Sequence, residues 1–215
     1  MVHIKFIYKI QLLMAIMKIL HKQMMIILVV IVTLTPSIFA QEQYLADFAG
    51  FSNHWTILGG YGVSHKGLGA TDTRVETADI ILRYGRFLTG ELGTSWYKGR
   101  HEILIEVPFR TVVHPETAIM TGINFLATWN FTAGDSIIPY ILVGGGPVYT
   151  NLDIPGLGAE LNYSYQGGAG LHYFISKNRS INVNYRLHHI SNAGTADPNE
   201  PLNSSRILVG VTFFR

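Results

Sequence analysis

The sequence contains no cysteine and has few charged residues. The lack of cysteine excludes a disulfide-stapled scaffold, a thiolate zinc site and a cysteine nucleophile. Charged residues make up only 14% of the 215 residues, whereas soluble globular proteins average roughly 25%. Hydrophobic residues make up 48%, which is far too many for a disordered chain. These features favour a folded protein whose outer surface does not rely on charge for solubility.

The formal net charge of +2 comes entirely from the first 40 residues. Four of the 16 Lys and Arg residues lie there, and none of the 14 acidic residues does, so residues 41–215 carry 12 basic and 14 acidic groups. The rest of the chain is therefore slightly acidic. Because it has no basic stripe, we do not expect nucleic acid as a partner.

Residues 1–40 have the layout of a secretory signal peptide. Four lysines precede an apolar run over residues 24–34, and small residues lead to Ala40. The run is shorter than the roughly 20 apolar residues of a membrane-spanning helix, and Pro36 interrupts it. We expect cleavage after Ala40, with Met17 as the true start or residues 1–16 as an upstream extension. The alternative is a retained N-terminal anchor.

Residues 41–215 show alternating apolar and polar positions rather than a helical repeat. Eight such segments are separated by clusters of Gly, Pro, Asn and Asp, which is typical of antiparallel strands joined by turns. We predict an all-β fold, an eight-stranded antiparallel up-and-down barrel. The predicted strands cover residues 54–66, 75–87, 101–114, 117–131, 137–150, 162–175, 180–191 and 205–214.

Two kinds of barrel fit this pattern. A lipocalin-like soluble barrel has an apolar interior and a charged exterior, whereas a transmembrane barrel has an apolar exterior and a polar interior. The polar faces of segments 180–191 and 205–214 are mostly small or amide-bearing rather than covered in Lys and Glu, and 26 charged residues in residues 41–215 are too few to coat a soluble barrel. Glu106 and Arg110 share one face of their segment and are expected in a polar network inside the barrel. We therefore predict a transmembrane barrel in the bacterial outer membrane.

The end of segment 180–191 contains a His-x-Ser motif. Continuing the apolar face by twos reaches His189 and Ser191, which places both polar side chains on the lipid-facing side. A serine hydroxyl becomes a nucleophile when an adjacent base takes its proton, so the pair suits acyl transfer on a lipid. Alternatively, the alternation lapses at the strand end and both residues join the following loop.

The string from His189 to Gly194, His-Ile-Ser-Asn-Ala-Gly, is followed by Asp197, Pro198 and Asn199. In the last hairpin of a secreted barrel, this string resembles the PagL-type family of lipid A 3-O-deacylases. The resemblance is sharp over residues 185–214 and loose over the rest of the barrel. It implies an outer-membrane esterase that hydrolyses the ester-linked acyl chain at the 3 position of lipid A.

By this resemblance, Ser191 is the nucleophile and His189 the general base. The family's third member is a glutamate about fourteen residues after the histidine, a position that Asn203 occupies here. An amide oxygen can orient an imidazole but cannot supply the charge of a carboxylate. Asn203 is therefore the first expectation for the third member, and Glu200 the second, with Asp197 also able to reach from the loop.

The resemblance also implies donors for the oxyanion of the tetrahedral intermediate. The backbone N–H of Gly194 and the side chain of Asn199 are the candidates, with Asn192 as a helper. Gly194 and Asn199 equally suit a turn that needs positive φ. No metal or organic cofactor is expected, because the remaining histidines lack metal-ligand spacing.

The expected partners are lipid A or lipopolysaccharide of the outer leaflet and the membrane itself. The resemblance permits a homodimer. The alternative function is a non-catalytic outer-membrane barrel with a structural or ligand-binding role, and the replacement of the family's glutamate by Asn203 favours it.

Overall fold

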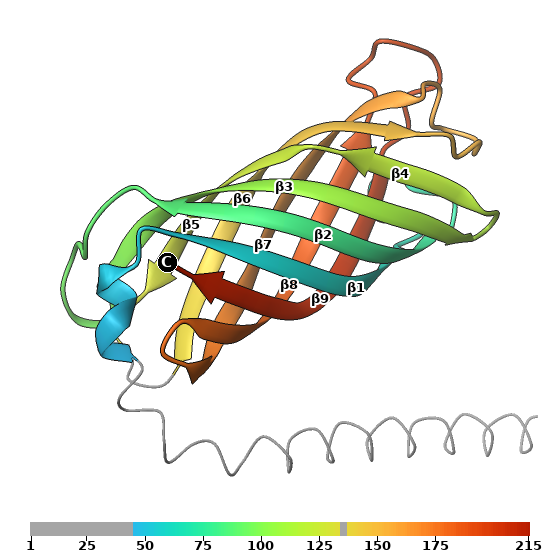
Figure 1. Ribbon diagram of the computed structural model, residues 1–215. Coiled ribbons are helices and arrows are strands. Elements are labelled where there is room, and N and C mark those ends of the chain that lie inside the picture. Colours follow the sequence, from blue (N-terminus) through green and yellow to red (C-terminus); the bar gives the residue numbers. More distant parts are fainter. Residues whose placement is uncertain (1–44, 134–136) are drawn as a thin grey trace, which may run out of the picture. The chain divides into compact units, whose positions relative to one another are not determined.

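The computed structural model describes residues 45–133 and 137–215 (Figure 1). The predicted signal peptide, residues 1–40, lies outside the described residues. A 3-10 helix, η2 (Leu45–Gly50), precedes the strands, and a second, η3 (Ser95–Tyr97), follows β2. The strands are β1 (Asn53–Ser64), β2 (Glu76–Phe87), β3 (Gly99–His114), β4 (Ala118–Gly122), β5 (Asn124–Phe131), β6 (Ile137–Thr150), β7 (Leu161–Ser176), β8 (Arg179–Ser191) and β9 (Leu202–Phe214).

The strands form one closed antiparallel sheet. Strands that follow one another in sequence pair with each other, except that β4 and β5 both lie between β3 and β6, and β1 pairs with β9, which closes the barrel. The predicted segment 117–131 is divided into β4 and β5. Both pair with β3 in the same register, and both pair with β6 in the same register. The gap at Ile123 lies near Pro108 of β3, which has no N–H to donate to the ladder. The chain is thus an eight-stranded barrel with one interrupted strand, which confirms the predicted fold.

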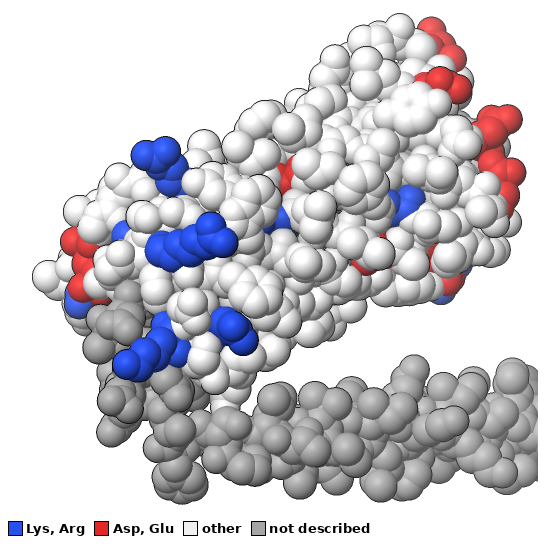
Figure 2. All heavy atoms as spheres, in the orientation of Figure 1, with Lys and Arg blue, Asp and Glu red and all other residues white. Residues whose placement is uncertain are grey.

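The two faces of the barrel have opposite character. Exposed large apolar side chains follow the outer face of every strand, whereas arginines, carboxylates and amides fill much of the inner face. Figure 2 shows Lys and Arg near the rim where β9 ends and Asp and Glu at the opposite rim, with a largely uncharged surface between. This arrangement excludes the lipocalin-like alternative, which needs an apolar interior, and suits a barrel surrounded by lipid.

The interior has a polar middle between two apolar layers. In the middle, Glu106 accepts hydrogen bonds from Arg83 and Arg186, and Asp79 pairs with Arg206. Arg110 is also buried there, with its Nε 3.9 Å from Asp79 Oδ2, so Glu106 and Arg110 both lie in the polar middle, as the sequence predicts. The apolar layers at the two ends consist mainly of Phe48, Phe87, Ile138, Phe174 and Phe214, and of Val112, Met120, Val148, Leu152, Ile190 and Leu202.

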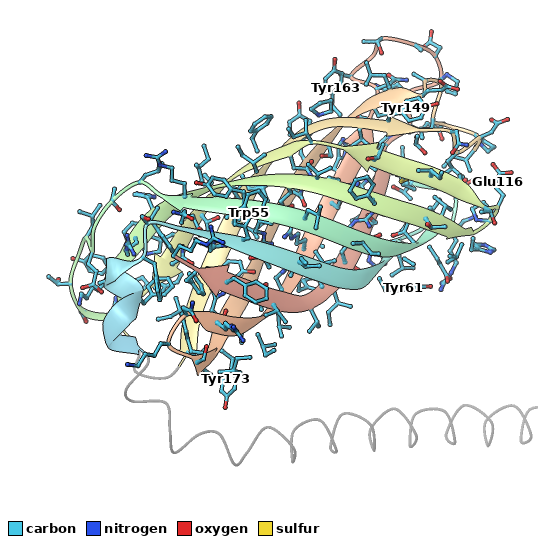
Figure 3. All side chains as sticks on the ribbon, viewed as in Figure 1. Trp55, Tyr61, Glu116, Tyr149, Tyr163 and Tyr173 are labelled. Carbon is cyan, nitrogen blue, oxygen red and sulfur yellow. The ribbon has the colours of Figure 1, made fainter. Side chains whose placement is uncertain are left out.

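Aromatic side chains lie toward both rims of the outer surface. Figure 3 shows Tyr61, Tyr149 and Tyr163 toward the rim opposite the C-terminus and Tyr173 toward the C-terminal rim. Aromatic rings at two levels are typical of barrels that cross the two interfaces of a membrane. In residues 45–133 and 137–215, no helix is long and apolar enough to cross a membrane.

The rim opposite the C-terminus, called the far rim below, carries the connections 65–75, 115–117, 151–160 and 192–201. The connection 192–201 is braced by the connection 151–160, since Glu200 N donates to Gly156 O and Gly158 N donates to Pro198 O. Leu157 and Asn199 form a bridge between the same two loops. The His-x-Ser motif stands at this rim, where β8 ends.

Candidate active site

His189 and Ser191 lie on the outer face of β8, two residues apart along the strand. His189 Nε2 lies 3.3 Å from Ser191 Oγ, within hydrogen-bond distance. Both side chains are half-buried, while the intervening Ile190 points inward and is fully buried. The strand alternation therefore continues to Ser191, as the sequence pattern predicts, and keeps both polar groups on the apolar side of the barrel.

Asn203 lies on the other side of the imidazole. In the ladder between β8 and β9, Asn203 is the direct partner of His189. Its Oδ1 lies 2.8 Å from His189 Nδ1. Ser191, His189 and Asn203 thus form a continuous chain of hydrogen bonds, with the imidazole bonded through both nitrogens. This is the geometry of a hydroxyl nucleophile, a base and a residue that orients the base.

The carboxylates that the sequence offers as alternatives lie elsewhere. The side chain of Glu200 lies against Gly156, and that loop also holds the Glu200 main chain. The backbone of Asp197 lies beside Gly158. Within the described ranges, neither carboxylate is hydrogen-bonded to His189, and the imidazole instead contacts the amide of Asn203.

The oxyanion candidates belong to the turn directly after Ser191. Asn192 and Thr195 bracket a tight turn, closed by Thr195 N donating to Asn192 O, in which Ala193 and Gly194 both have positive φ. Asn192 Oδ1 accepts the Gly194 N–H at 2.9 Å, and Asn192 Nδ2 donates to two loop carbonyls. The Gly194 N–H and the Asn192 side chain are therefore both engaged in hydrogen bonds that hold the turn.

Asn199 is placed differently from the other two oxyanion candidates. Its Oδ1 accepts the backbone N–H of Asn192 at 3.0 Å, which brings the side chain next to the peptide that follows Ser191. Its Nδ2 has no hydrogen-bond partner among residues 45–133 and 137–215. Of the three candidates, Asn199 is the one that holds a spare side-chain donor beside Ser191.

The structure also brings together a second His-Ser pair that the sequence reasoning missed. His65 Nε2, from the connection 65–75, lies 2.7 Å from Ser205 Oγ on β9. The two residues are 140 positions apart, so only the ladder between β1 and β9 reveals the pair. Ser205 is buried, at 8% exposure, and His65 has no described partner at its other nitrogen. Within the described residues, the His65–Ser205 pair has no third residue in the position that Asn203 takes beside His189.

A groove of about 860 Å³ runs along the outer surface next to His189. Val143, Tyr165 and Leu187 form its apolar sides, and glycines of β6 and β7 line it. Added Cβ atoms at Gly144 and Gly145 would collide with backbone oxygens of the neighbouring strands, so these glycines allow close strand approach as well. The groove connects the candidate active site with the lipid-facing surface of the barrel.

A family model described as lipid A 3-O-deacylase (PagL) matches residues 78–212. The chain belongs to the PagL family. The matched range contains His189, Ser191 and Asn203, and it covers more than half of the chain. Among the curated proteins, none matches the chain. This protein is therefore a member of a lipid A deacylase family, and its location is the bacterial outer membrane.

Two solved outer-membrane barrels are similar to the chain. A crystal structure of the outer membrane enzyme PagL has 22% identity and a TM-score of 0.51, covering 73% of this chain and 97% of the other. A crystal structure of Neisserial surface protein A has 12% identity and a TM-score of 0.56, covering 75% of this chain and 96% of the other. These likenesses support the barrel fold, and the family model supports the activity class.

Proposed function

We propose that this protein hydrolyses the ester-linked acyl chain at the 3 position of lipid A, with Ser191 as nucleophile and His189 as general base. The observation that carries the proposal is the hydrogen-bonded chain from Ser191 through His189 to Asn203 on the lipid-facing surface. Apolar residues would pack against lipid better than this polar relay does, so packing does not explain its presence at this place. Membership of the PagL family supports lipid A as the substrate.

In the first step, Ser191 Oγ attacks the ester carbonyl while His189 Nε2 takes the hydroxyl proton. The 3.3 Å separation of these atoms is long for a hydrogen bond, and such contacts shorten once a substrate is bound. The tetrahedral intermediate then collapses. The proton on His189 passes to the sugar oxygen, which leaves, and the acyl chain remains esterified to Ser191.

In the second step, water attacks the acyl-enzyme with His189 again acting as base, and a free fatty acid is released. Both steps place negative charge on the former carbonyl oxygen, which needs hydrogen-bond donors. Asn199 Nδ2 is the proposed donor, because the Asn199 side chain already contacts the backbone next to Ser191. The Gly194 N–H contributes if it exchanges its bond to Asn192 Oδ1 for the oxyanion.

The groove beside His189 is the proposed place of the scissile acyl chain. Its sides are apolar, and it opens to the surface that faces lipid, so a chain can enter without crossing water. Burying one methylene is worth about 0.8 kcal/mol, so a long chain binds far more strongly than a short one. This reaction requires that the far rim face the outer leaflet, so that His189 and Ser191 lie where lipid A headgroups meet the acyl region.

The test is mass spectrometry of lipid A from cells that express the wild type, Ser191→Ala, His189→Ala or Ser205→Ala. We expect loss of the 3-O-linked acyl chain with the wild type and with Ser205→Ala, and intact lipid A with the other two variants. Heat-modifiable migration in detergent shows whether each barrel has folded. Deacylation that persists in a folded Ser191→Ala protein would refute the assignment, and intact lipid A with the wild type would favour a non-catalytic barrel.

A further inference from the structure

The side-chain amide of Asn203 is held from behind by the connection 65–75 between β1 and β2. Asn203 Nδ2 lies 2.8 Å from the carbonyl oxygen of Leu68 and 3.1 Å from Thr71 Oγ1. These contacts join residues about 130 positions apart, across the seam where β1 closes on β9. The connection 65–75 thus touches the far side of the relay, and in the described residues it makes no hydrogen bond to His189.

The Leu68 carbonyl determines which way the Asn203 amide points. A backbone carbonyl oxygen can only accept a hydrogen bond, so the atom of Asn203 that faces it must be the NH₂ group. The carbonyl oxygen Oδ1 of the amide then faces His189. The orientation of the amide, which is otherwise ambiguous, follows from the chemistry of its partner.

This orientation in turn sets the tautomer of His189. Because Asn203 Oδ1 only accepts, His189 Nδ1 must carry the proton that bonds to it. His189 Nε2 is then unprotonated, with its lone pair directed toward Ser191 Oγ. This is the form that a general base requires. A reversed amide would favour the opposite tautomer, which has no lone pair available for the serine proton.

Thr71 fixes the connection against β9. Its hydroxyl donates to Pro201 O at 2.7 Å and accepts from the backbone N–H of Asn203 at 2.8 Å. Thr71 is buried, although most of its neighbours in the connection are exposed. Asn203 O also accepts from His65 N at 2.9 Å, so main chain and side chain of Asn203 are both held by this connection.

We propose that Leu68 and Thr71 are positioning residues that adapt this active site to a neutral amide at position 203, giving a Ser-His-Asn relay. This inference rests on the proposed function for its kinetic consequences. A carboxylate at position 203 would place a second oxygen against the Leu68 carbonyl, and the two acceptors would repel. The neutral amide at position 203 is therefore the side chain that suits the contact with the Leu68 carbonyl.

The kinetic test is a double-mutant cycle between Thr71→Val and Asn203→Ala in the full-length protein, with a soluble ester as substrate. Thr71→Val removes the hydroxyl at similar volume, and we expect it to lower kcat about tenfold, the effect of one net hydrogen bond. In the Asn203→Ala background the same change should have little further effect, because Thr71 acts through Asn203. An equal loss in both backgrounds, or no loss in either, would overturn the proposal.

Three further variants sharpen the cycle. Thr71→Ser retains the hydroxyl and should recover most of the activity that Thr71→Val loses. Thr73→Val, in the same connection, serves as the matched control, because the Thr73 hydroxyl has no hydrogen bond within the described residues. Asn203→Asp should be slower than the wild type even though it introduces a carboxylate. A faster Asn203→Asp enzyme would overturn the proposal.

A spectroscopic readout keeps the positioning role separate from the esterase assignment. The ¹⁵N spectrum of histidine-labelled protein in detergent, with His189 assigned by His189→Gln, reports the tautomer whether or not the protein turns over. We expect the Nδ1–H form in the wild type and a mixture in Thr71→Val. An Nε2–H wild type that still hydrolyses the ester would refute the positioning role alone, whereas an inactive wild type in the Nδ1–H form would refute the esterase assignment alone.

Discussion

His189 on β8 and Asn203 on β9 are a cross-strand pair, with Nδ1 and Oδ1 2.8 Å apart. Both backbones are held by the sheet ladder, which fixes their separation, and the connection 65–75 orients the Asn203 amide. Sites built on strands are held more accurately than sites on loops. The neutral third residue is therefore well placed, although it offers no charge to stabilise an imidazolium.

Asn203→Ala should lower the rate of lipid A deacylation by about 10- to 100-fold, the effect of losing one to two hydrogen-bond equivalents around the base. The loss should be smaller than in a triad whose third member is charged, because no carboxylate is removed. Initial rates on purified lipopolysaccharide measure it. An unchanged rate would show that another group orients His189.

Asn199→Asp should separate the loop role of Asn199 from its catalytic role. The aspartate keeps the oxygen that accepts the Asn192 N–H but loses the Nδ2 donor. We expect kcat to fall by about 10²- to 10³-fold, as for other oxyanion donors, while heat-modifiable migration stays normal. If the variant keeps full kcat, the oxyanion donor must lie elsewhere.

Gly167→Val should change the preferred length of the acyl chain. A Cβ at Gly167 would meet only Leu142 O at 3.8 Å, so the fold tolerates a side chain that projects into the groove. We expect slower hydrolysis of long-chain p-nitrophenyl esters, with short-chain esters little affected.

The matched control for this substitution is Gly59→Val. Gly59 is exposed on β1, its Cβ would meet only Asp79 O at 3.9 Å, and it does not line the groove. The control should retain the wild-type preference. Equal effects of the two variants on chain-length preference would mean that the groove does not hold the acyl chain.

Glu106→Gln should destabilise the barrel. Glu106 is fully buried and accepts hydrogen bonds from Arg83 and Arg186, so its neutralisation leaves two buried cations without their counter-charge. Breaking one partner of a buried pair costs about 3–5 kcal/mol. The midpoint of urea unfolding in detergent, followed by heat-modifiable migration, measures the change.

Lys66→Ala is the control for Glu106→Gln. Lys66 pairs with Asp72, and both side chains are more than two-thirds exposed. Such surface pairs contribute little, so the midpoint should stay within the equivalent of about 0.5 kcal/mol. A Glu106→Gln protein as stable as Lys66→Ala would contradict the role assigned to the inner network.

The strands could be predicted from sequence because alternation is local. The predicted segment 180–191 matches β8 to within one residue at each end. The alternation that directs Ile181 outward also directs His189 and Ser191 outward. The interruption between β4 and β5 was missed, because it depends on Pro108 in the neighbouring strand rather than on residues within the segment.

The surroundings of the site could not be predicted in the same way. The contacts of Asn203 with Leu68 and Thr71, and of His65 with Ser205, join residues that are 132 to 140 positions apart. They exist because β9 closes on β1, which fixes the register between strands but leaves no local trace in the sequence. The turn after Ser191 likewise shows its use of Asn192 and Gly194 only in three dimensions.

The most direct test of the catalytic assignment is labelling of the folded protein with a fluorophosphonate, followed by identification of the modified peptide by mass spectrometry. We expect modification at Ser191, which disappears in His189→Ala and persists in Ser205→Ala. Modification at Ser205, or labelling of Ser191 that does not depend on His189, would contradict it.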